Sequence, residues 1–194
     1  QAAGAPMVGV EVFSRVQAPE FPDLKQSVGV SLSSETANEL YFVHIAQNVD
    51  AFWTGVVIIN TADAAASVNV EVYNTDGELL NELTQLDFAA GEKKTFLVTK
   101  DLLPFGAGAA WVKVSGNQPL AGYELFGTFE NADLFAGFEA VTRLGGRMVL
   151  PHTENAVNAG SYTGVAIINP QDTSVELVLE LISQSGQVKQ RVRK

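Results

Sequence analysis

Apolar and polar residues alternate over short stretches along most of the chain, and turn-forming residues separate these stretches. Residues 67–73 show the period of two that is typical of a strand with one buried face, and residues 55–59 form a β-branched run. Asp76-Gly77 predicts a tight hairpin turn, because such turns need residues that tolerate positive φ. Further strands are predicted at 79–86, 94–98, 110–114, 122–126, 135–141 and 148–150. A turn is predicted at 116–119, between the third and fourth of these, and Gly122 suggests a bulge or a close strand approach. Helical periodicity is weak, with one turn expected over 99–105, so the pattern predicts an all-β protein.

One pattern occurs twice. The letters TGVVIIN at 54–60 return as TGVAIIN at 163–169, an offset of 164 − 55 = 109 between the glycines. Downstream, residues 70–77 correspond to 179–186 at the same offset, and upstream 41–44 correspond to 149–152 at an offset of 108. A second correspondence runs the other way, and it relates 7–14 to 120–127 and 27–33 to 135–141. The chain is therefore predicted to contain an internal repeat.

These matches predict the domain organisation. Residues 40–148 form one complete β-sandwich unit, residues 1–39 look like the end of a unit, and residues 149–194 look like the beginning of one. Because half a sandwich leaves strand edges uncovered, we expect the two chain ends to pair as a second, discontinuous and partial unit. That unit lacks a counterpart of residues 86–118. A fused two-fold assembly and a piece of a longer array stay open as alternatives.

The TGVVIIN run, the alternating strand with its Asp-Gly turn, and the letters AAGEKKTFLV at 89–98 resemble an immunoglobulin-like sandwich. Together with residues 40–44 and GYELFG at 122–127, they are similar to repeats of uncharacterised bacterial secreted and surface proteins. Val43 and Tyr162 depart from the proline and tryptophan of that pattern. The resemblance implies two related Ig-like units located outside the cell, at its surface or in the periplasm, and it carries over no catalytic residue.

Charge and cysteine content narrow the possible partners. Twelve Lys and Arg against 22 Asp and Glu give a net charge of −10, which repels nucleic acid and anionic lipid. There is no cysteine for a disulfide, a thiolate zinc site or a nucleophile, and no apolar run is long enough for membrane insertion. The small, uncharged start at 1–6 is similar to that of a mature secreted protein.

No catalytic motif is present, and we expect no enzyme. His44 and His152 occupy equivalent repeat positions, and a structural role at strand ends is favoured over a metal site with Glu154. A glycosidase needs a pair of carboxylates. The candidates lie at alternate strand positions, where a solvent-facing row is the ordinary explanation; they are Glu71, Glu124, Glu139 and Glu180.

Oxygen-rich turns and aromatic residues supply the remaining candidate sites. No cofactor is expected, but three turns at 60–63, 74–78 and 130–133 leave a structural Ca²⁺ open, although Asx turns explain them and none has EF-hand spacing. The candidate ligand-binding residues are Trp53, Tyr162 and Tyr41, which could form a platform on which a sugar stacks. The repeat favours the alternative, in which these side chains pack at the edge of the sheet. Trp111 is assigned to the core.

The sequence thus predicts a non-catalytic extracellular binding or structural module, with carbohydrate binding or adhesion as its concrete form and a glycan or another surface protein as its partner. Two alternatives remain. One is a glycoside hydrolase that uses strand carboxylates in a cleft between units. The other is a spacer or assembly subunit of a surface protein, which exposed apolar edges would indicate. The basic run at 189–194 is predicted to be an edge strand.

Overall fold

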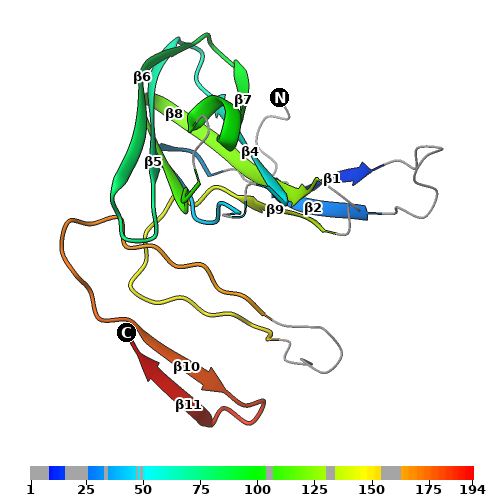
Figure 1. The fold of residues 1–194 in the computed structure, drawn as a ribbon, viewed down its shortest axis with the longest axis vertical. Helices are drawn as coiled ribbons and strands as arrows, with labels where there is room; N and C mark the ends of the chain where they lie inside the picture. The colour runs from blue at the N-terminus through cyan, green and yellow to red at the C-terminus, as the bar shows by residue number, and fades with distance from the viewer. Residues whose placement is uncertain are drawn as a thin grey trace, which may run out of the picture.

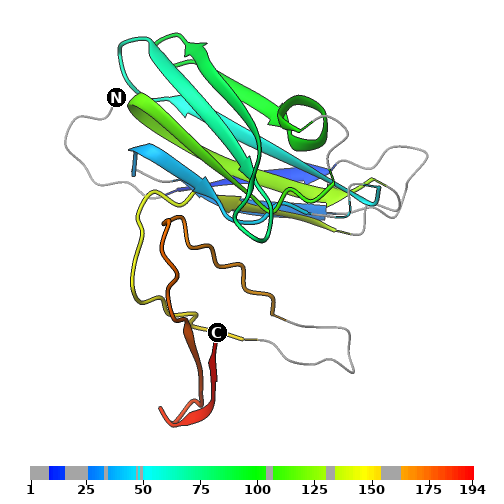
Figure 2. The same cartoon turned by 60° about the vertical axis from the view of Figure 1, so that its left-hand side comes forward.

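The computed structural model describes residues 9–15, 26–32, 35–46, 48, 50–103, 107–129, 134–153 and 163–194. These residues are mostly β-structure, as the alternation predicts, with one short π-helix at Val98–Leu102. The main sheet is a curled half-barrel of antiparallel strands, accompanied by two small two-stranded sheets (Figures 1 and 2). The strands are β1 (Gly9–Arg15), β2 (Gln26–Leu32), β3 (Ala37–Phe42), β4 (Phe52–Asn60), β5 (Ala66–Tyr73), β6 (Leu79–Phe88), β7 (Lys93–Leu97), β8 (Trp111–Thr128), β9 (Phe135–Glu139), β10 (Val178–Ile182) and β11 (Val188–Arg193).

Strand β8 organises the main sheet. Its first half pairs with β5 on one side and β3 on the other, and its second half pairs with β4 and β9. The turn predicted at residues 116–119 is wrong, because the strand continues through it. The β5 ladder ends at Gly116 and the β4 ladder begins at Leu120. The missing N–H of Pro119 therefore falls where β8 changes partners, and no ladder bond is lost.

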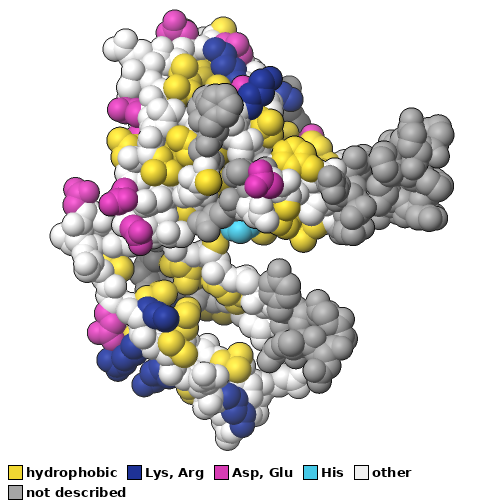
Figure 3. Space-filling model, in the orientation of Figure 1, with side chains coloured by type: hydrophobic (Ala, Val, Ile, Leu, Met, Phe, Trp, Pro, Cys, Tyr) yellow, Lys and Arg dark blue, Asp and Glu magenta, His cyan; other side chains and the backbone are white. Residues whose placement is uncertain are grey.

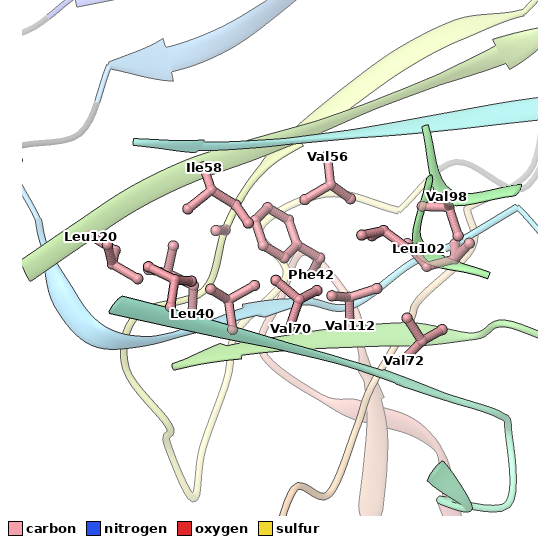
Figure 4. Close-up of a cluster of buried hydrophobic side chains, with 14 of the residues drawn as sticks. Leu40, Phe42, Val56, Ile58, Val70, Val72, Val98, Leu102, Val112 and Leu120 are labelled. Carbon is pink, nitrogen blue, oxygen red and sulfur yellow. The ribbon is translucent and has the colours of Figure 1, made fainter. Parts of the chain in front are cut away.

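The curl of the sheet encloses one hydrophobic core (Figure 4). Strand β5 alternates strictly between buried and half-buried residues, which confirms its predicted period of two. Among the core side chains that are at most 1 % exposed, ten come from four strands (β3, β4, β5 and β8) and the π-helix: Leu40, Phe42, Val56, Ile58, Val70, Val72, Val98, Leu102, Val112 and Leu120. Gly122 permits the close strand approach expected of it, since a Cβ there would lie 2.5 Å from the carbonyl oxygen of Val57.

The hairpin formed by β1 and β2 packs face to face on β8 and β9. The ring of Phe13 lies 5.5 Å from that of Tyr123, centroid to centroid. Val30 is 5 % exposed and covers Gly137, where an added Cβ would lie 3.0 Å from the valine Cγ2. The other face of the hairpin carries Val10 and remains open to solvent.

The described residues beyond 148, which are 149–153 and 163–194 and are called the tail below, extend away from the main sheet (Figures 1 and 2). Within the described residues, β10 and β11 pair only with each other. The strand predicted at 148–150 is not formed, and residues 164–170 form none either, because strands need a neighbour to take their backbone hydrogen bonds. Strand β11 confirms the strand predicted in the terminal basic run.

The all-β prediction is therefore confirmed, whereas two Ig-like sandwiches are not evident among the described residues. The β1–β2 hairpin, called the head hairpin below, contacts β9 of the main sheet, and the tail lies apart from the sheet. The domain boundaries at 40–148 and at the two chain ends remain a prediction.

Candidate functional site

A cleft of about 1060 Å³ separates the main sheet from the tail (Figure 3). The sheet side includes His44, Tyr73, Trp111 and Lys113, and the tail side is formed by residues 165–174. This is the concave feature in which a ligand would be sought first.

Two stacked aromatic rings line the sheet side of the cleft. Tyr73 and Trp111 are paired across β5 and β8, with ring centroids 4.0 Å apart and ring planes within 5°. Trp111 is 8 % exposed, which confirms its assignment to the core. The stack covers one face of each ring, and burial leaves little of the Trp111 surface for contact with a sugar.

A closed polar network lies on the same strands. The register places Tyr41 and Glu71 opposite Lys113, and the ammonium lies 3.3 Å from the carboxylate of Glu39 and 3.8 Å from that of Glu71. Tyr41 donates to Glu39 and Tyr73 to Glu71, each at 2.9 Å. Burial, then these carboxylates, raises the pKa of both phenols to about 12. The hydrogen bond from Tyr41, helped by Lys113, lowers the pKa of Glu39. The charged and hydroxyl groups of this network thus find their ion-pair and hydrogen-bond partners within it.

Glu124 is the buried carboxylate of the described chain, at 1 % exposure. The solvent-facing row predicted for it is wrong, since the register puts it opposite Val56 of the core and Phe138. Neither of its oxygens has a hydrogen-bond partner among the described residues. Burial raises the pKa of Glu124 to about 8, and the nearby backbone N–H of His44 offsets this only in part, without reaching hydrogen-bond geometry. With that pKa the acid is mostly protonated at neutral pH, and it does not line the cleft.

The other candidate glutamates do not gather around Glu124. Glu71 belongs to the Lys113 network, and Glu180 pairs with Arg191 on the tail. Glu139 lies opposite Tyr123, whose side chain points to the other face of β8.

The two histidines occupy different environments. The His44 ring meets Phe126 edge-on at 4.9 Å, centroid to centroid, and burial lowers its pKa. His152 lies on the exposed tail. Glu154 lies outside the described residues, and within the described ones no cluster of three metal-ligating side chains occurs. His44 thus packs at the end of its strand.

The predicted aromatic platform is spread over two parts of the sheet. Trp53 lies opposite Gly127 and packs against Phe135 with 5.8 Å between ring centroids. Tyr41 is 5 % exposed and lies opposite Lys113, at the other half of β8. Tyr162 lies outside the described residues. Ligand binding by these three residues remains a prediction.

The oxygen-rich turns use their polar groups internally. Asn60 is buried, donates to the carbonyls of Ala64 and Ala89, and accepts from the N–H of Ala62. Asn74 accepts from the backbone N–H groups of two following turn residues, which is the Asx turn expected there. The turn at 130–133 lies outside the described residues.

Sequence reasoning missed an apolar surface on the tail, which appears yellow in the lower part of Figure 3. Its side chains are 37–57 % exposed, and we call them the tail surface: Val165, Ile167, Val175, Leu179 and Leu181. The sequence did contain a signal for this surface. The chain ends lack a predicted counterpart of residues 86–118, and in the complete unit those residues supply the strand that would cover such a surface. Exposed apolar clusters of this kind mark interaction surfaces.

In the described residues, no helix has the length and apolar character needed to cross a bilayer. The chain matches no family model, no curated protein and no solved structure, so the case for its function rests on its own residues.

Proposed function

We propose that the protein is a non-catalytic extracellular structural module built from Ig-like repeating units, at the cell surface or in the periplasm. Its tail is the first half of a unit, and its head hairpin is the second half of another. The tail surface carries this proposal, because it matches the interior of the complete unit at residues 40–148.

Backbone geometry in the tail supports the repeat. With the offset of 109, the β5–β6 pairs Val70–Leu83 and Glu71–Glu82 become Leu179–Val192 and Glu180–Arg191, which are the pairs that β10 and β11 make. The register shift after Val72 recurs after Leu181.

The turns correspond as well. Gly77 and Gly186 have φ of 82° and 81°. The backbone N–H of each glycine donates a hydrogen bond to the carbonyl of the residue that begins its four-residue turn, which is Asn74 or Ser183. The Asn169 side chain donates to the carbonyl of Thr173 at 2.7 Å, as Asn60 does to Ala64.

Exposure separates the two copies. The counterparts of the tail surface in the complete unit are 3 % exposed or less: Val56, Ile58, Ala66, Val70 and Val72. Full burial of a valine or leucine stabilises by about 1.5–3 kcal/mol, and the tail side chains are near half exposed, so covering them yields roughly 4–8 kcal/mol in total. That is similar to the stability of a small domain. Burial of the tail surface by another strand is therefore strongly favourable.

The chemistry of the site favours a structural role over catalysis or sugar binding. The one buried carboxylate among the described residues, Glu124, is closed off from the cleft. Tyr73 and Trp111 stack one ring face on each other, and Trp53 and Tyr41 lie opposite different halves of β8, so these aromatic residues do not form one open platform.

An in-frame extension tests the proposal. Lys194 corresponds to Gln85 (85 + 109 = 194), so a second copy of residues 86–148 appended after Lys194 continues the repeat. We expect amide hydrogen exchange at residues 164–182 to slow markedly, because the added β8-type strand covers the tail surface. The matched control carries Val112→Asp and Val114→Asp in the appended copy only. Unchanged exchange with the intact extension contradicts the proposed unit.

A further inference from the structure

The head hairpin repeats the geometry of the β8–β9 ladder. With an offset of 113 on β8 (122 − 9) and 108 on β9 (137 − 29), the pairs Glu124–Phe138 and Leu125–Gly137 become Glu11–Val30 and Val12–Gly29. These are the pairs that β1 and β2 make. All five pairs of the β8–β9 ladder transfer in this way. The hairpin is thus a β8–β9-type ladder that has β2 in the place of β9.

The hairpin lacks the partner that β8 has on its other side. In the complete unit, that side of β8 pairs with β4. In the described chain, β1 pairs with β2 alone, so its outer edge presents unpaired backbone groups. On the exposed face next to this edge stand Val10 and Val12, at 59 % and 60 % exposure.

The tail holds a β4-type segment that lacks a β8. Residues 164–170 correspond to the second half of β4, and among the described residues no strand pairs with them. Each chain end therefore has what the other requires: a β8-type edge at the head and a β4-type segment in the tail.

The two ends of one chain occupy different regions of the main sheet. The hairpin covers Tyr123 in the second half of β8 and Gly137 in β9. The tail faces the first half of β8, with residues 165–174 across the cleft from Trp111 and Lys113. Figure 1 shows the hairpin lying beside β9, whereas the tail extends below the sheet.

We propose that the outer edge of β1 in one copy binds residues 164–167 of a second copy by strand addition. The inference rests on the proposed repeating unit. The β4–β8 register transfers directly, so that Gly164 lies opposite Val12, Val165 opposite Glu11, and Ala166 opposite Val10. Because the two surfaces differ, the contact is heterologous, and repeating it links copies head to tail into open chains.

Cysteine cross-linking tests both the contact and its register, since the chain has no cysteine of its own. Glu11→Cys and Val165→Cys are made in separate full-length chains, mixed and oxidised under mild conditions. Residues directly opposite each other bring their Cβ atoms to about 4.5–5.5 Å, near the spacing of a disulfide. We expect a cross-linked dimer to form several-fold faster than with Val10→Cys and Val165→Cys. In that control pair, the Val10 side chain points to the other face of β1.

Sedimentation velocity of the unmodified chain gives a second measurement, and we expect the average mass to rise with concentration. Equal cross-linking by the two pairs overturns the register, and a monomer at every concentration overturns the contact. A double variant carrying both Glu11→Cys and Val165→Cys that closes within one chain at low concentration also overturns it, in favour of intramolecular pairing. If the in-frame extension protects the tail while these tests fail, the repeating unit stands and only the second copy is rejected.

Discussion

The buried carboxyl group of Glu124 predicts an unusual dependence of stability on pH. Its pKa is about 8 in the folded protein, against 4.5 as the ordinary value. Between these values the folded state holds a proton that the unfolded state has released, so the free energy of unfolding falls as pH rises. The difference of about 3.5 pH units corresponds to about 5 kcal/mol at 1.36 kcal/mol per unit. That contribution is fully present below pH 4.5 and lost above pH 8.

The variant Glu124→Gln keeps the side-chain shape but cannot ionise. We expect its stability relative to the parent protein to increase by about 5 kcal/mol between pH 4.5 and pH 8, because only the parent loses a proton on unfolding. Urea denaturation, followed by tryptophan fluorescence at several pH values, measures the difference. Asp63→Asn at an exposed position makes the same change of charge and serves as the control. A Glu124→Gln difference that stays constant with pH refutes the buried, protonated acid.

Two further substitutions test packing and the buried turn. Gly122→Ala places a Cβ 2.5 Å from the Val57 carbonyl oxygen and should destabilise the protein by about 1–3 kcal/mol in urea denaturation. The control Gly146→Ala should change stability little, because its Cβ meets nothing within 4 Å. Equal effects of the two substitutions would contradict the close approach. Asn60→Ala removes two buried hydrogen bonds that its amide donates and should lower the free energy of unfolding by about 2–3 kcal/mol. The same substitution at its exposed counterpart, Asn169→Ala, should lower it by less than about 0.5 kcal/mol. A large loss of stability at Asn169 would show that the tail is already covered.

Local patterns predicted the parts of the fold that depend on neighbouring residues. The alternation in 67–73 and the turn at Asp76-Gly77 correspond to β5 and the hairpin that follows it. Trp111, among small and apolar neighbours, is buried as expected. In each case the strand period and the turn geometry are properties of a few consecutive residues.

The misses depend on partners distant in the sequence. Pro119 reads as a strand breaker, yet it lies within β8 because the strand changes partners there. Glu124 fits a solvent-facing row by its alternation, yet the loop that carries His44 and Ile45 covers that face. The segment at 164–170 has the composition of β4 but forms no strand among the described residues, because composition does not supply a neighbour.

The central place of β8 has a consequence for synthesis of the protein on the ribosome. Strands β3 to β7 emerge before β8, although β3, β4 and β5 all pair with it. Until β8 leaves the exit tunnel, only pairs such as β5–β6 can form. During this interval the core-facing apolar side chains of β4 and β5 lack the strand that pairs with both, so a chaperone that shields them would limit aggregation.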